Sequence, residues 1–442
     1  MRMKNFSDPI EKIRRSALRR WIVVAVLTMS CVLTARASYL LLPMDDKQAN
    51  HLKAYGVTYW VIAQNVDAFW LLNYRGGSFA LPNVKLIEKE CLTRGVSFEV
   101  ITDAEFERIK MEIANPEVNQ EVMKLEKAPK IAVYSPELNE KGERIQPWDD
   151  AVTLALTFAE IPFEKIYDKE IIGGMLAKYD WLHLHHEDFT GQYGKFWAQY
   201  NGFEWYRENQ ARQERVATEL GFSKVSQLKL AVAKKIKEYI VGGGFLFTMC
   251  SATDSYDIAL SAEGIDICER MFDGDPMDAD PDNKLDFSKT LAFKNFTLIK
   301  DPVTYEFSSI DNNLGRKVLP DQDYFNLFDF SAKWDPVPTM LTQDHTRTIK
   351  GFMGQTTAFK KEYIKSDVLI LGENKAADEV RYIHGSLGYG TWTFYAGHDP
   401  EDYQHHVGDP PTDLTLHPNS PGYRLILNNI LFPAAKKKER KT

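Results

Sequence analysis

Short apolar runs alternate with longer amphipathic segments along most of the chain. The apolar runs predict strands at 39–44, 58–62, 96–101, 131–134, 163–167, 181–185, 245–249, 368–371, 381–384 and 391–396. The amphipathic segments predict helices at 49–56, 85–94, 149–160, 170–178, 205–239 and 423–432. Strands that alternate with helices form parallel sheets covered on both faces. The pattern therefore predicts an α/β fold with a doubly wound, mostly parallel sheet.

Breaks in this pattern divide the chain. A polar segment with Pro116 and Pro129 separates a small N-terminal α/β domain, 38–125, from a main domain, 130–435. Within the main domain, 270–360 is rich in turn residues and is predicted to be an irregular insertion. The residues 436–442 form a basic tail.

The first 37 residues have the layout of a secretory signal peptide. Arginines precede the apolar run 21–34, and Ala35 and Ala37 supply the small residues of a cleavage site. The run is shorter than the roughly 20 residues of a membrane-spanning helix. We therefore expect an exported, periplasmic protein with no transmembrane segment after cleavage.

The net charge and the cysteine count indicate which partners and which thiol chemistry to expect. The chain has 54 basic and 62 acidic residues, and this negative balance argues against a nucleic-acid partner. Cleavage after residue 37 would leave Cys91, Cys250 and Cys268. An odd count in an exported protein leaves at least one free thiol, and a Cys91–Cys268 bridge is one open alternative.

Cys250 lies at a predicted strand–elbow–helix junction. Gly242–Gly244 and an apolar run precede it, and a helix start follows it. Such an elbow places a side chain at the carboxyl end of a strand, where open α/β sheets bind ligands. The amides of the following helix favour a thiolate there. The alternative is a small buried core cysteine.

This elbow resembles the nucleophile elbow of class I glutamine amidotransferase-like proteins, which have a flavodoxin-like fold. A second motif supports the resemblance: the strand 391–396 leads into Gly-His-Asp-Pro-Glu at 397–401, where that superfamily commonly has His-Pro-Glu. The resemblance implies a triad in which Cys250 is the nucleophile, His398 the base and Glu401 the residue that orients it, with Asp399 as substitute. No glycine-rich turn for an oxyanion hole precedes this motif at the expected strand.

The chain after residue 37 also resembles an exported Bacteroidota family commonly labelled asparagine synthetase B. The segments 52–56, 72–79, 183–192 and 417–424 carry this resemblance. It implies a protein of the cell envelope. The loop 251–255 lacks the two glycines with which an ATP-dependent synthetase approaches pyrophosphate, so the residues imply no ATP site.

A second cluster of reactive side chains ends the predicted strand 181–185. His183, His185, His186 and Glu187 form a candidate site for zinc or another divalent metal, and His398, His405 and His406 are further candidate ligands. The alternative is a set of hydrogen-bonded core or rim histidines. Without a metal, His185, His186, Glu187, Asp254 and Asp399 remain candidates for a substrate pocket.

A third motif has the spacing of a calcium loop at Asp278, Asp280 and Asp282. Asn283 and Lys289 stand where such a loop needs glycine and glutamate, which favours a solvated acidic loop. We therefore predict no cofactor other than a divalent metal at the histidine cluster.

These motifs support three hypotheses on function. The first is a thiol-dependent hydrolase or transferase that acts on an amide-like bond of a small molecule or peptide. The second is a non-catalytic binding or scaffold protein of the cell envelope, with a protein partner there. The third is a metal-dependent hydrolase that uses His185, His186 and Glu187.

Overall fold

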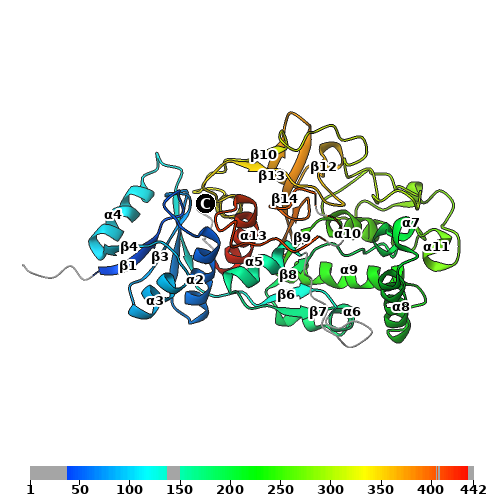
Figure 1. Cartoon of the computed structure of the whole chain (residues 1–442), viewed down its shortest axis with the longest axis horizontal. Helices are drawn as coiled ribbons and strands as arrows, with labels where there is room; N and C mark the ends of the chain where they lie inside the picture. Colours follow the sequence, from blue (N-terminus) through cyan, green and yellow to red (C-terminus); the bar gives the residue numbers. More distant parts are fainter. Residues whose placement is uncertain (1–36, 137–149, 405, 407–408, 437–442) are drawn as a thin grey trace, which may run out of the picture.

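Two β-sheets organise the chain (Figure 1). A computed structural model describes residues 37–136, 150–404, 406 and 409–436. The predicted signal peptide up to residue 36, the tail 437–442 and His405 lie outside the described residues. Among the helices of the described ranges, none combines the length and the apolar character needed to cross a membrane.

The smaller sheet belongs to the N-terminal part and is antiparallel throughout, in the order β4-β1-β3-β2-β5. Its strands are β1 (Ala37–Leu42), β2 (Ala68–Leu72), β3 (Ser78–Pro82), β4 (Glu99–Thr102) and β5 (Glu121–Leu125). Its helices are α2 (His51–Ala63), α3 (Lys85–Thr93) and α4 (Asp103–Ala114). Thr102 and Glu105 form a capping box that starts α4.

The strand predicted at 58–62 is wrong, because these residues form the second half of α2. Most of α2 is buried, from His51 to Ile62, so apolar residues occur on all its faces. A short apolar run without helical periodicity cannot be distinguished from a buried strand by pattern alone.

The larger sheet has the order β11-β10-β13-β14-β15-β9-β8-β6-β7, with β12 paired to β14. Its strands are β6 (Ile131–Tyr134), β7 (Glu164–Ile166), β8 (Trp181–Leu184), β9 (Phe245–Met249), β10 (Tyr324–Leu327), β11 (Thr348–Lys350), β12 (Phe359–Lys360), β13 (Leu369–Asn374), β14 (Glu379–Leu387) and β15 (Gly390–Tyr395). The pairs from β15 through β9, β8 and β6 to β7 are parallel. The pairs from β11 to β15 are antiparallel.

The predicted doubly wound, mostly parallel, flavodoxin-like sheet is therefore wrong. One sheet is antiparallel and the other is mixed. A two-residue turn at Gly388 and Tyr389, with Gly388 at φ 62°, joins β14 directly to β15. A parallel neighbour would instead need a crossover of a dozen or more residues, which this turn excludes.

Helices cover both faces of the parallel half (Figure 1). The helices of the larger part are α5 (Ala151–Ala159), α6 (Asp168–Ile172), α7 (Trp197–Tyr200), α8 (Glu204–Glu219), α9 (Val225–Val241), α10 (Ala252–Ser261), α11 (Arg270–Asp273), α12 (Pro336–Leu341) and α13 (Pro421–Leu431). Short 3₁₀ helices are η1 (Met175–Lys178), η2 (Tyr193–Lys195), η3 (Pro281–Lys284), η4 (Lys361–Tyr363) and η5 (Phe432–Ala434). The single helix predicted at 205–239 is wrong, since Gly221 at φ 83° separates α8 from α9.

The side chains of each parallel strand alternate between two cores. Phe247 and Met249 join Leu156 of α5 and Leu425 of α13 in one core. Leu246 joins residues of α9 and α10 in the other. The central parallel strands β6 and β8 are thus buried along their whole length, whereas the edge strand β7 is partly exposed.

Candidate functional site

The carboxyl ends of β8, β9 and β15 lie side by side, because these three strands are parallel neighbours. His185 follows β8, Cys250 follows β9 and His398 follows β15. Backbone hydrogen bonds fix their spacing: Ala252 N donates to His185 O over 2.9 Å, and Cys250 N donates to Gly397 O over 3.2 Å. The structure therefore gathers the residues of two separate sequence motifs at one edge of the sheet.

Cys250 has the left-handed backbone of a strand–helix elbow, with φ 52°. Its side chain is buried, and burial raises the pKa of the thiol to about 11, although the backbone amides of Thr356, Gln355 and Ser251 oppose this shift. Desolvation thus outweighs the helix amides that the sequence pattern invoked for a thiolate. Nucleophilic catalysis by Cys250 stays a prediction.

Three imidazoles meet beside this elbow. His185 Nε2 lies 3.2 Å from His398 Nδ1, and one ligand nitrogen from each of His185, His186 and His398 falls within 4.8 Å of the others. His185 and His398 are buried, whereas His186 is exposed. The group is therefore open to solvent on the side of His186.

Asp150 contacts His183 and His185 and is almost fully buried. Its Oδ1 lies 3.1 Å from His183 Nε2 and 3.3 Å from His185 Nδ1. The same oxygen accepts hydrogen bonds from the amides of Val152 and Thr153 and so caps α5. Burial opposes ionisation of Asp150, but the two histidines hold its pKa well below the usual range.

The pKa of His185 is lowered, chiefly by burial, while Asp150 opposes that shift. A neutral imidazole whose Nδ1 faces a carboxylate presents its Nε2 to the opposite side. That side is occupied by His398. Asp150, His185 and His398 thus lie in a row of polar contacts. Within this row, His185 Nε2 and His398 Nδ1 are the nitrogen atoms that can either accept a proton or bind a metal ion.

The described residues include two further groupings of potential metal ligands. Asp150, His183 and His185 form one, and Asp266, Cys268 and Asp273 form the other. At the second, Lys224 Nζ lies 2.9 Å from Asp273 and also contacts Asp266, so an ammonium group already occupies the space between these carboxylates and offsets part of their charge. Clusters that could hold a metal are therefore present, and the His-rich one is not neutralised in this way.

The predicted calcium spacing does not assemble into a common site. Asp282 accepts hydrogen bonds from Leu298 N and Lys300 Nζ, each over 2.7 Å. Asp278 lies 3.6 Å from Lys284. Asp278 and Asp282 thus have separate partners, which include residues outside their own loop.

Two carboxylates of the predicted triad have other partners. Glu401 lies 3.1 Å from His417 Nδ1. Asp399 accepts hydrogen bonds from Tyr423 Oη over 2.8 Å and from Glu401 N over 2.9 Å. Asp399 and Glu401 thus contact α13 and the loop before it, while Asp150 is a carboxylate that contacts His185.

The remaining predicted pocket residues lie around the elbow. Asp254, in the first turn of α10, accepts a hydrogen bond from Thr356 Oγ1 over 2.9 Å, and burial raises its pKa to about 7. Glu187 is half-buried, and burial raises its pKa, while Lys229 and His186 oppose the shift. Both carboxyl groups are therefore easier to protonate than usual.

Sequence reasoning missed Asp150. An aspartate directly before an apolar helix is a recognisable N-cap signal. That signal predicts the hydrogen bonds from the amides of Val152 and Thr153. It does not predict the hydrogen bond with His183 or the close approach of His185, since both residues lie more than 30 positions away and their contacts depend on the order of the strands.

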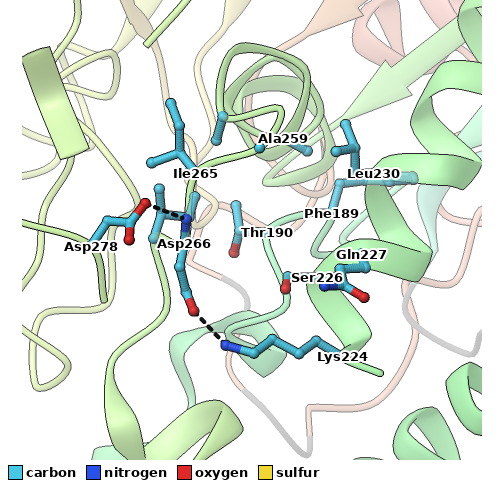
Figure 2. Close-up of a pocket in the computed structure, with 13 residues that line it drawn as sticks. Phe189, Thr190, Lys224, Ser226, Gln227, Leu230, Ala259, Ile265, Asp266 and Asp278 are labelled. Carbon is cyan, nitrogen blue, oxygen red and sulfur yellow. Dashed lines mark hydrogen bonds and ion pairs between the residues drawn. The ribbon is translucent and has the colours of Figure 1, made fainter. Parts of the chain in front are cut away.

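A cavity of about 310 Å³ lies between α9, α10 and the loop after the histidine run (Figure 2). Phe189, Leu230 and Ala259 contribute apolar surface, and Thr190, Lys224 and Asp266 contribute polar groups. None of the predicted catalytic residues or histidine ligands lines the cavity, whereas Asp278 of the calcium-like spacing does.

Comparisons with known proteins show no family for this chain. No family model matches it, and no curated protein matches it. Among solved structures, cytoplasmic protein STM3548 from Salmonella typhimurium is 11% identical, with 70% of this chain and 100% of that chain covered and a TM-score of 0.33. Cytoplasmic protein STM1381 from Salmonella typhimurium LT2 is 13% identical, with 70% and 100% covered and a TM-score of 0.33. Gan42B, a GH42 β-galactosidase, is 10% identical, with 62% and 28% covered and a TM-score of 0.25.

Proposed function

We propose that the protein is a metal-dependent hydrolase whose metal ion is held by His185, His186 and His398. The observation that carries this proposal is the 3.2 Å separation of His185 Nε2 and His398 Nδ1. Two nitrogen ligands of a tetrahedral zinc ion, each about 2.05 Å from the metal, lie about 3.3 Å apart. The pair therefore has the spacing of two ligands of one ion.

The surroundings of the pair support the same reading. Asp150 faces the far nitrogen of His185, as carboxylates do behind zinc-bound histidines. A neutral imidazole is the ligating form, and the pKa of His185 is lowered. Because imidazole ligands suit zinc, and three histidines leave a fourth position for water, we assign zinc to this centre.

A zinc ion held by His185, His186 and His398 would act as a Lewis acid and would lower the pKa of a water molecule, which would supply the nucleophile for hydrolysis. Hydrolysis also requires that a proton pass from the water to the leaving group. Glu187 is the candidate proton carrier, because it directly follows His186 and its raised pKa suits general acid–base work.

Metal binding is tested first. The purified chain is dialysed against a chelator and titrated with Zn²⁺ and with Co²⁺, whose visible absorption reports tetrahedral coordination. We expect one ion per chain, with affinity reduced at least about 100-fold in His185→Ala and His398→Ala but unchanged in the control His417→Ala. Equal binding by all four proteins would overturn the proposal.

Activity is tested next on chromogenic esters, anilides and phosphate esters. Hydrolysis by the zinc-loaded chain is expected to disappear on chelation, to return with zinc and to be absent in His185→Ala. Hydrolysis that survives both chelation and this substitution would exclude the metal centre from the reaction.

A second candidate function is thiol-dependent hydrolysis or transfer at an amide-like bond through Cys250. The specific observation in its favour is the φ of 52° at a strand–helix elbow, with backbone amides directed at the sulfur. The Asp150–His185–His398 chain would then supply the base. This function predicts that Cys250→Ser abolishes hydrolysis and that chelation does not. If neither chelation nor Cys250→Ser has an effect because no substrate is hydrolysed, the non-catalytic binding role is favoured.

A further inference from the structure

A pair of buried carboxyl groups lies beside the segment 354–358. Asp254, on α10, and Asp311, in the loop before β10, are 1% and 4% exposed. Asp254 Oδ1 accepts a hydrogen bond from Thr356 Oγ1, and Asp311 Oδ1 accepts one from the backbone amide of Thr357 over 3.1 Å. Because Thr356 and Thr357 are consecutive, one short segment positions both carboxyl groups.

Each of these carboxyl groups has one oxygen without a partner. Asp254 Oδ2 and Asp311 Oδ2 are buried and make no hydrogen bond, although the first oxygen of each is held firmly. Asp311 Oδ1 accepts from four backbone amides, those of Asn312, Asn313, Thr357 and Ala358. Such a set of donors fixes the rotamer and leaves the second oxygen directed elsewhere.

The charge around the pair is not balanced. Among the described residues, neither Asp254 nor Asp311 takes part in an ion pair, and Asp254 and Glu306 both raise the pKa of Asp311 in addition to its burial. The buried ammonium of Lys195 donates to Ile299 O, and its own carboxylate neighbours include Asp188 and Glu306. Buried carboxylates without a cation must either take up protons or acquire a counter-ion.

Two more unpartnered oxygens lie next to this pair. The side-chain oxygens of Asn312 and Asn313 are buried and accept no hydrogen bond. Asn313 Nδ2 donates to Gly354 O and Gln355 O, in the same segment that leads to Thr356. Carboxylate and amide oxygens, with no nitrogen or sulfur among them, are the ligand set of hard cations.

We propose that Asp254 and Asp311 bind a hard divalent cation, Ca²⁺ or Mg²⁺, at a site distinct from the His-rich centre. Ca²⁺ is the better fit, because it accepts six to eight oxygens in flexible geometry and includes amide side-chain oxygens among its ligands. The cation would tie α10, which begins at the elbow, to the loop 354–358 that covers Cys250. It therefore has a structural role beside the reactive groups.

The test is calcium binding by the full chain, after dialysis against a chelator and with one equivalent of Zn²⁺ added to fill the His-rich centre. We expect one Ca²⁺ per chain by equilibrium dialysis, and a rise in the unfolding midpoint of roughly 2–5 °C at saturating Ca²⁺. Asp254→Asn and Asp311→Asn are expected to lower the calcium affinity at least tenfold and to abolish the rise. Mg²⁺ is titrated in parallel, and a rise with Mg²⁺ but not with Ca²⁺ would reassign the preferred ion.

Two controls locate the ion. Asp280→Asn, in the loop that has a calcium-like spacing, is expected to bind Ca²⁺ normally, and its left-handed backbone, φ 49°, accepts asparagine. His185→Ala is expected to bind Ca²⁺ normally as well, so failure of the hydrolase proposal and failure of this one are separable. Loss of calcium binding only in Asp280→Asn, or no uptake of either ion by the unaltered chain, would overturn the site at Asp254 and Asp311.

Discussion

Substitution of Asp150 separates two roles that one oxygen atom performs. Asp150 Oδ1 faces His183 Nε2 and His185 Nδ1 and also caps α5 through the amides of Val152 and Thr153. Asparagine has nearly the same shape and caps helices as well as aspartate does, so Asp150→Asn removes the charge and keeps the cap. Asp150→Ala removes both.

The expected magnitudes follow from these contacts. Loss of a carboxylate behind a zinc-bound histidine typically weakens metal binding by about 10–100-fold, or about 1.4–2.7 kcal/mol. We expect this loss in Asp150→Asn and in Asp150→Ala. The alanine variant should lose about 1 kcal/mol more of unfolding free energy than the asparagine variant, because the cap of α5 is gone.

The assay combines competition for Zn²⁺ against a chromophoric chelator with urea unfolding of the metal-free chains. Thr102→Ala is the matched control, because Thr102 caps α4 in the N-terminal part. It should lose a similar amount of stability, about 1 kcal/mol, without any change in zinc affinity. If Asp150→Asn binds Zn²⁺ within twofold of the unaltered chain, Asp150 does not position His185 as a ligand, and the reasoning is refuted.

Three further outcomes are expected. A Cβ at Gly56 would lie 1.8 Å from the carbonyl oxygen of Ala159, so Gly56→Ala should lower the unfolding free energy in urea by about 1–3 kcal/mol, whereas an unchanged value would mean that α2 and α5 can separate at no cost. Burial lowers the pKa of His384 to about 4, so as the pH falls the unfolded chain is protonated at this residue before the folded chain is. The free energy of unfolding should therefore fall by up to about 3 kcal/mol between pH 6.5 and 4. Urea titrations across this range should show a flatter slope for His384→Gln. The raised pKa of Cys250 predicts negligible labelling by iodoacetamide in the folded chain below about pH 9, read by mass spectrometry, and a labelling midpoint below the free-thiol value of about 8.5 would contradict it.

Local sequence signals were enough to predict that His185 and Cys250 follow strands of one sheet. The strands predicted at 131–134, 181–185 and 245–249 correspond to β6, β8 and β9, and residues that follow parallel neighbours must share an edge. This is why His185 and Cys250 are neighbours in the structure as they are in the prediction. The pairing of His398 with them required only that β15 lie beside β9.

The contacts of Asp150 and Glu401 and part of the antiparallel sheet could not be predicted from local sequence signals. The contact of Asp150 with His183 depends on the pairing of β6 with β8, which no motif encodes. Glu401 follows His398 in the sequence, as glutamate follows histidine in the His-Pro-Glu motif. Its side chain nevertheless pairs with His417, and the inserted Asp399 accepts a hydrogen bond from Tyr423. The apolar runs 381–384 and 391–396, with Gly388-Tyr389-Gly390 between them, predict a hairpin-like pair, which corresponds to β14 and β15. The strands β10, β11 and β12 were missed because they lie in the turn-rich segment 270–360, where short apolar runs give no clear pattern.

The packing of α2 has a consequence for how the chain folds and how it can be divided. One continuous apolar core includes Leu40 and Leu52 from the N-terminal part together with Ile131, Phe247 and Leu425 from the larger part. Heat or denaturant should therefore melt both parts in a single cooperative transition, since neither can open without exposing the other. A truncated chain that begins at residue 130 would carry a bare apolar face over α5 and α13 and should aggregate on expression. The N-terminal part thus covers an apolar face of the part that carries the histidines.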